Sequence, residues 1–109
     1  MTRIELERRA GRFCGLSVSG HSGYAEAGGD IVCAAVSAIT ELTANGITEI
    51  AGVPAELSSD PATAAVRLRL TDGQAQDPLC QAFLAAFFQE AARIAEDYAE
   101  YVTINLMEV

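Results

Sequence analysis

Hydrophobic and polar residues alternate in several short stretches of the chain, with the period of two that is typical of half-buried β-strands. Residues 3–7 and 13–19 predict a first hairpin. Residues 54–58 and 64–71 predict a second hairpin, which turns around Ser59-Asp60-Pro61. A last strand carries apolar residues at alternate positions: Val102, Ile104 and Leu106.

Two longer stretches place apolar residues three and four positions apart, which predicts helices. The first helix is expected to start at Asp30, a capping carboxylate, and to end near Gly52, before Pro54. Its expected buried face is Val32, Val36, Ile39 and Thr43. The second helix is expected to start at Asp77-Pro78, a capping residue followed by proline at the first helical position. Its expected buried stripe is Leu79, Phe83, Phe87, Ala91, Ile94 and Tyr98.

The predicted order of elements is β-β-α-β-β-α-β. Both helices are expected on one face of a mostly antiparallel sheet, which makes an α+β two-layer sandwich. No linker, repeat or low-complexity tract divides the sequence, so residues 1–109 are predicted to form a single domain.

Composition narrows the classes of partner. The net charge is −8, half of the residues are hydrophobic, and all seven basic residues are arginine. An acidic chain without clustered cations is not expected to bind nucleic acid, whereas it would attract a basic partner. No apolar run is expected to reach the ~20 residues that span a bilayer. The N-terminus does not resemble a signal peptide, and a cytoplasmic location without membrane contact is the expectation.

His21 and Cys33 are the candidate catalytic residues of the chain. His21 is its one histidine and follows the expected end of the second strand, while Cys33 is expected in the first turn of the first helix. A helix N-terminus and an imidazole both favour a thiolate, which is the nucleophilic form of cysteine. The residues alone leave two interpretations open: a catalytic pair, or a small buried cysteine beside an incidental histidine.

The segment around this pair supplies further candidates. Asp30 is either a helix cap or a residue that orients His21, and Ser37 lies one turn after Cys33, where it would contact substrate backbone or its own helix. Tyr24 is a candidate substrate contact. Four glycines predict a flexible loop that orders on peptide binding: Gly20, Gly23, Gly28 and Gly29.

A metal site is not expected. Cys14 and Cys80 join His21 and Cys33 as candidate ligands, but their spacings do not fit a paired-ligand zinc pattern. Cys14 is instead expected on an apolar strand face with Leu16 and Val18. No cofactor is expected.

The string Gly20-His21, followed by Gly29-Asp30-Ile31-Val32-Cys33-Ala34-Ala35-Val36-Ser37-Ala38, resembles the signature of the ribosomal-processing cysteine proteases, the Prp family. The resemblance covers nearly the whole chain, including the acidic end of the second helix at residues 96–101. It implies a homodimer, with Cys33 as nucleophile and His21 as general base. It also implies the substrate, a basic large-subunit ribosomal protein precursor, number twenty-seven. Its N-terminal extension would be cut after an aromatic residue and before a small one.

Two other classes of function remain beside the protease. One is a non-catalytic ribosome-assembly module that binds a peptide in the same groove without cutting it. The other is a thiol-based redox sensor, in which Cys33 would be oxidised reversibly.

Overall fold

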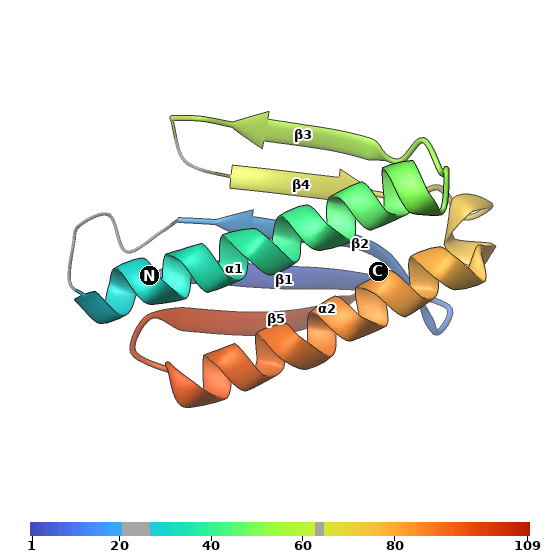
Figure 1. Ribbon diagram of the computed structural model, residues 1–109. Coiled ribbons are helices and arrows are strands. Elements are labelled where there is room, and N and C mark those ends of the chain that lie inside the picture. Colours follow the sequence, from blue (N-terminus) through green and yellow to red (C-terminus); the bar gives the residue numbers. More distant parts are fainter. Residues whose placement is uncertain (21–26, 63–64) are drawn as a thin grey trace.

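The computed structural model of the chain describes residues 1–20, 27–62 and 65–109, with residues 27–30 described as backbone only. Five strands, two long helices and two short helical turns follow one another in the predicted order (Figure 1). Their bounds are β1 Thr2–Arg9, β2 Arg12–Ser19, α1 Ala27–Asn45, η1 Gly46–Ile50, β3 Glu56–Asp60, β4 Ala65–Arg69, η2 Gln74–Gln76, α2 Pro78–Asp97 and β5 Val102–Glu108. The turn η2 is an element that the hydrophobic pattern did not predict.

The strands form one sheet in the order β3-β4-β2-β1-β5. Neighbours pair antiparallel except β1 and β5, which run parallel with Thr2 opposite Val102. Figure 1 shows α1 and α2 side by side over the same face of the sheet. The expected α+β layering, with a mostly antiparallel sheet, is therefore confirmed.

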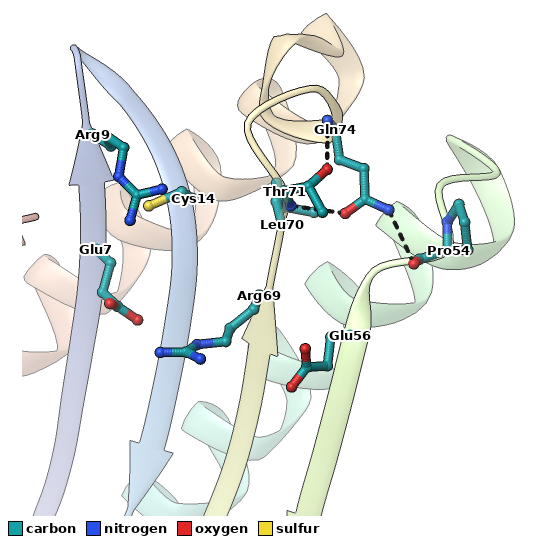
Figure 2. Close-up of a pocket in the computed structure, with 9 residues that line it drawn as sticks. All are labelled: Glu7, Arg9, Cys14, Pro54, Glu56, Arg69, Leu70, Thr71 and Gln74. Carbon is teal, nitrogen blue, oxygen red and sulfur yellow. Dashed lines mark hydrogen bonds between the residues drawn. The ribbon is translucent and has the colours of Figure 1, made fainter.

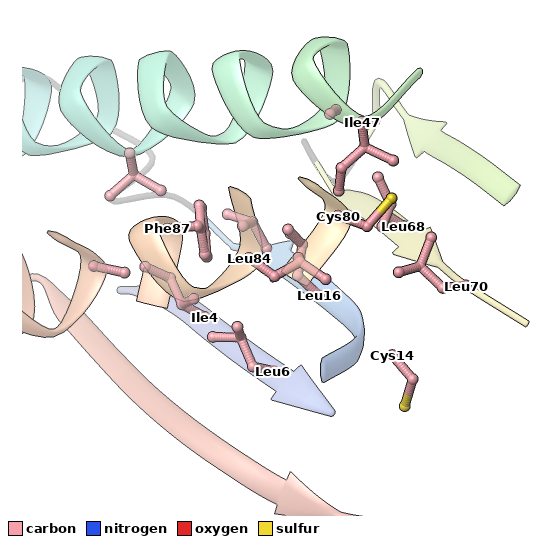
Figure 3. Packing of buried hydrophobic residues seen from close by; sticks show 14 of the residues in the cluster. Ile4, Leu6, Cys14, Leu16, Ile47, Leu68, Leu70, Cys80, Leu84 and Phe87 are labelled. Atoms are coloured by element: carbon pink, nitrogen blue, oxygen red, sulfur yellow. The ribbon is translucent and has the colours of Figure 1, made fainter. Parts of the chain in front are cut away.

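The core lies between the sheet and the two helices. Inward residues of the central strands, such as Ile4, Leu6 and Leu16, meet Ile47 and Leu84 from the helical layer (Figure 3). The alternating pattern of β1 and β2 predicted these inward positions, because side chains of a strand point to opposite faces in turn.

A bulge interrupts the pairing of β1 with β2. Glu7 faces Gly15 but Arg8 faces Phe13, so Cys14 is the extra residue of β2. Cys14 is buried, as expected from the apolar pattern.

Helix α1 begins at Ala27, three residues before the expected start. Asp30 is therefore inside the helix and is not its N-cap, and Gly28 and Gly29 are helical rather than part of a loop. Glycine disfavours a helix by only about 1 kcal/mol relative to alanine, so two glycines do not prevent a helix that is favoured by its later residues.

The buried face of α1 differs in part from the prediction. Val32, Val36 and Thr43 are buried as expected, and Ile39 packs at the edge of the core. Thr40 is also buried. Its hydroxyl donates to the carbonyl oxygen of Val36 at 2.7 Å, so burial leaves this polar group paired.

The end of α1 is a π-helical turn, η1. The amide of Ala51 donates to the carbonyl oxygen of Gly46 at 2.8 Å, five residues earlier. Gly52 then adopts a left-handed φ of 68°, which ends the helix where the sequence predicted. Gly46 lies so close to α2 that a Cβ there would overlap the ring of Phe83.

Helix α2 begins as predicted. The Asp77 carboxylate accepts hydrogen bonds from the amides of Leu79 and Cys80, and Pro78 occupies the first turn. The two ends of the predicted buried stripe are exposed instead: Leu79 is 50% exposed and Tyr98 42% exposed. Its buried members are Cys80, Leu84, Phe87, Ala91 and Ile94.

One helical stretch, Ile31–Ile50, is long and apolar enough to cross a membrane by length and composition alone. The expectation that no such run exists was wrong. The same stretch supplies Val32, Val36 and Ile47 to the core, while Ile31, Leu42 and Ile50 are exposed. This composition is therefore weak evidence for a membrane span.

The contact between Gly46 and Phe83 predicts that Gly46→Ala destabilises the protein, although alanine is the better helix former. The new methyl group would displace the Phe83 ring, and overpacking of this kind costs about 1–3 kcal/mol. Urea unfolding measures the difference. Gly73→Ala is the matched control, because its Cβ would have only a Thr71 oxygen at 4.0 Å as a neighbour. A Gly46→Ala variant as stable as the control would contradict the tight contact.

Candidate functional site

Cys33 lies in the second turn of α1, six residues after the helix begins at Ala27. The expectation of a first-turn position is wrong, because it depended on a helix start at Asp30. The dipole effect falls off within the first turn, so it favours a Cys33 thiolate less than the sequence suggested. The side chain is half-buried.

The side chain of Cys33 meets the beginning of the sheet. Its Sγ lies 3.9 Å from Oγ1 of Thr2, the first residue of β1. The Thr2 amide in turn donates to the carbonyl oxygen of Tyr101 at 2.8 Å, just before β5. Three segments that are far apart in the sequence therefore meet beside the sulfur.

The end of β2 reaches the same place. Ser19 pairs with Arg3, and the next residue, Gly20, has a φ of 58°. A Cβ on Gly20 would be 2.9 Å from the carbonyl oxygen of Met1, so the chain passes close to the start of β1 at this point. His21 follows Gly20 in the sequence, two residues after β2 ends at Ser19.

Several candidates lie outside the described residues. These are His21, Gly23 and Tyr24, together with the side chain of Asp30. The pairing of His21 with Cys33, the contact of Tyr24 with substrate and the orienting role of Asp30 therefore stay predictions. Ser37 is described and is exposed on α1, one turn after Cys33.

The other two cysteines lie away from Cys33 and are buried. Cys80 is in the first turn of α2, as predicted. Cys14 lines a cavity of about 400 Å³ with Arg9 and Arg69, near the end of β1 opposite to Thr2 (Figure 2). Among the described residues, no group of three His, Cys, Asp or Glu side chains is placed to hold a metal ion.

An acidic hollow adjoins the Cys33 site through Tyr101. It has a volume of about 350 Å³ and is formed where α2 leads into β5. Its lining is Glu96, Asp97, Tyr98, Ala99, Glu100 and Tyr101. The acidic end of the second helix, which the sequence singled out, thus lies beside the segment that holds Thr2.

Sequence reasoning missed Thr2. The alternation that marked Ile4 and Leu6 as inward residues extends by one step to Thr2. A hydroxyl in such an apolar row was the available signal, since buried polar groups need a partner.

Burial raises the pKa of the Cys14 and Cys80 thiols above the ordinary value of 9.0. Both thiols are protonated in the folded and unfolded chain below that pH. As the pH rises above it, the unfolded chain loses protons that the folded chain retains, and the free energy of unfolding falls.

We expect urea midpoints measured from pH 7 to 10 to decline less steeply in Cys14→Ala and Cys80→Ala than in the wild type. Parallel curves would contradict the effect of burial.

The sequence and the fold of the chain were compared with those of known proteins. The chain matches the family described as Cysteine protease Prp over residues 1–103. The structure of SMU.848 from Streptococcus mutans is 28% identical with a TM-score of 0.91, over 100% of this chain and 96% of that chain. No curated protein matches the sequence.

Two structures of the ribosomal processing protease Prp from S. aureus share the fold. The complex with a substrate peptide has a TM-score of 0.84 at 23% identity, and the complex with a covalently linked product peptide has 0.82 at 24%. Each match covers 97% of this chain and 99% of that chain. Because the family match extends over nearly the whole sequence, the protein belongs to the Prp family of cysteine proteases.

Proposed function

We propose that this protease removes a short N-terminal extension from a large-subunit ribosomal protein, number twenty-seven, by cutting after an aromatic residue and before a small one. Cys33 is the nucleophile and His21 the general base. The observation that carries the proposal is the meeting of Cys33 with the start of β1, beside the strand end from which His21 continues. The S. aureus protease of the same fold is described as a ribosomal processing enzyme and binds a substrate peptide.

The backbone supports the proposed pair. Gly20 is in contact range of the Met1 carbonyl. Thr2, which follows Met1 in the chain, is the residue that contacts the Cys33 sulfur. Adjacent Cα atoms are about 3.8 Å apart, so His21 starts one residue from this position. A general base must come within hydrogen-bond reach of the thiol, and the proposal requires His21 to do so from this position in the chain.

In the proposed reaction His21 takes the thiol proton and the Cys33 thiolate attacks the scissile carbonyl carbon. The tetrahedral intermediate collapses as His21 returns the proton to the leaving amine. Water then hydrolyses the thioester between Cys33 and the substrate. This frees the new carboxylate and regenerates the thiol.

The oxyanion of the intermediate needs donors from outside the middle of α1. A residue in the second turn has its amide within the helical hydrogen-bond ladder, whereas the first four amides have no partner in the helix. We therefore propose that backbone amides within residues 20–30 donate hydrogen bonds to the oxyanion, and that the amide of Cys33 does not. Ser37 is exposed on the same helix and is proposed to contact substrate backbone.

With the start of α1 at Ala27, Asp30 is not needed as the helix cap. Two roles remain for its carboxylate: a favourable interaction with the positive end of the helix, and orientation of His21. We propose the second role.

The acidic hollow between α2 and β5 supports a basic substrate. It adjoins the Cys33 site and carries Glu96, Asp97 and Glu100. Together with the net charge of −8, it favours approach of a cationic ribosomal protein. We also propose that the protein is a homodimer, as the family resemblance implies, and that it acts in the cytoplasm.

A synthetic peptide tests the substrate. It spans the N-terminal extension and first mature residues of the host's own ribosomal protein twenty-seven, and mass spectrometry identifies the products. We expect one cut after an aromatic residue with the wild type and no cut with Cys33→Ala. Cys33→Ser should abolish cleavage while leaving the fold intact, because a hydroxyl needs stronger activation than a thiol. Cys14→Ala is the matched control, since that thiol lies at the other end of β1.

Other outcomes separate the rival functions. A peptide that binds without being cut favours the non-catalytic module. Reversible oxidation of Cys33 without proteolysis favours the redox sensor.

The role of His21 is tested by the reactivity of Cys33 toward iodoacetamide. We expect His21→Ala to slow alkylation of Cys33 near pH 7 by about tenfold, because the thiolate loses a charged hydrogen-bond partner that stabilises it. Ser22→Ala is the neighbouring control. An unchanged rate in His21→Ala would remove His21 from the mechanism.

A further inference from the structure

Thr2 places a hydroxyl in an otherwise apolar row of side chains. It is 3% exposed, and the next inward residues of β1, Ile4 and Leu6, are hydrocarbons with no exposed surface. Valine would fill the same volume without a polar atom. A buried hydroxyl at this position is unfavourable unless it has a hydrogen-bond partner.

The partner that the structure gives is Cys33, 31 positions away in the sequence, at 3.9 Å from oxygen to sulfur. Among the described residues, two other threonines are buried, and both bond their own helix. Thr40 donates to the carbonyl of Val36 and Thr43 to that of Ile39, each at 2.7 Å. Thr2 instead directs its hydroxyl to the side chain of another element.

The direction of this contact depends on the state of the sulfur. Either atom can donate while Cys33 is a thiol. A thiolate has no proton, so the hydroxyl of Thr2 must then be the donor. A hydrogen bond made to the charged form of a group stabilises that form.

The backbone holds the hydroxyl in place. Thr2 pairs with Val102 in the parallel ladder, and its amide donates to the Tyr101 carbonyl at 2.8 Å. Rotation about χ1 is therefore the main freedom left to this β-branched side chain, and it is itself restricted. A donor fixed before the reaction needs no reorganisation when charge develops.

We propose that Thr2 is a positioning residue for Cys33: its buried hydroxyl holds the cysteine side chain against the start of β1 and donates a hydrogen bond to the sulfur once the thiol has lost its proton. No covalent bond forms or breaks at Thr2, and the thiol proton goes to the general base. The inference rests on the proposed function only in taking Cys33 as the nucleophile.

Other ionisable groups lie near this end of the sheet, namely the Met1 amino group, Glu96, Asp97, Tyr98, Glu100 and Tyr101, and His21 and Asp30 precede Cys33 in the sequence. Every Thr2 variant retains all of them. A difference between variants that have and lack the hydroxyl therefore reports on the hydroxyl.

The test is the rate of Cys33 alkylation by iodoacetamide from pH 6 to 10, with the adduct located by peptide mass. Thr2→Val keeps the shape of the side chain and removes its hydroxyl, while Thr2→Ser keeps the hydroxyl. At pH 7 we expect Thr2→Val to react about three- to tenfold more slowly than the wild type, which is the net effect of losing one typical hydrogen bond. The rates should converge at the pH where the thiol is fully ionised, and Thr2→Ser should stay within about twofold of the wild type.

Two results would overturn the proposal: a Thr2→Val profile that matches the wild type, or a Thr2→Ser variant that is slowed as much as Thr2→Val. Thermal unfolding and intact mass confirm that the variants share one fold and one N-terminus. If Thr2→Val does not fold, Thr2→Ala compared with Thr2→Ser decides the same question.

Cleavage of the extension peptide provides a second readout. We expect Thr2→Val to lower kcat with KM unchanged, because the hydroxyl contacts the nucleophile and not the peptide. Alkylation needs no substrate. A wild type that leaves the peptide uncut would count against the proposed function while the alkylation profiles still decide the role of Thr2.

Discussion

Strand β1 is hydrogen-bonded on both sides, antiparallel to β2 and parallel to β5, and the candidate site depends on this double pairing. The start of β1 brings together segments that the sequence separates. The Met1 carbonyl lies against Gly20, the Thr2 amide bonds Tyr101, and the Thr2 hydroxyl meets Cys33. A one-residue slip of β1 would turn its apolar side chains out of the core and withdraw the hydroxyl from the sulfur.

Much of the fold could be predicted because each element carries its own period in the sequence. The strand alternation and the Asp77-Pro78 helix start are local signals, and the structure confirms both. The buried stripe of α2 was predicted less well. At the end of a helix, neighbouring apolar residues such as Leu79 and Cys80 fit the period almost equally. Packing against the rest of the molecule determines which of the two is buried.

The candidate site was predicted only in part. The role of Cys33 as nucleophile stays a prediction from its sequence context. Its expected place in the first turn of the helix was wrong, since glycine propensity is a weak guide to where a helix begins. The contact with Thr2 depends on how α1 lies over the sheet, and the support for Thr2 depends on a parallel pairing between the two ends of the chain. A local pattern carries information on neither arrangement.

The parallel ladder also determines when this site can be assembled. Synthesis proceeds from the N-terminus, so β1 and β2 are available to pair early, whereas the partner on the other side of β1 is the last strand made. Arg8 bonds Glu108 across a separation of 100 residues, and pairing between segments so far apart in the sequence is slow because closing a long loop costs entropy. Tyr101, which holds the amide of Thr2, is translated almost 70 residues after Cys33. A nascent chain therefore carries its cysteine well before the segment that holds Thr2 beside that cysteine has been made.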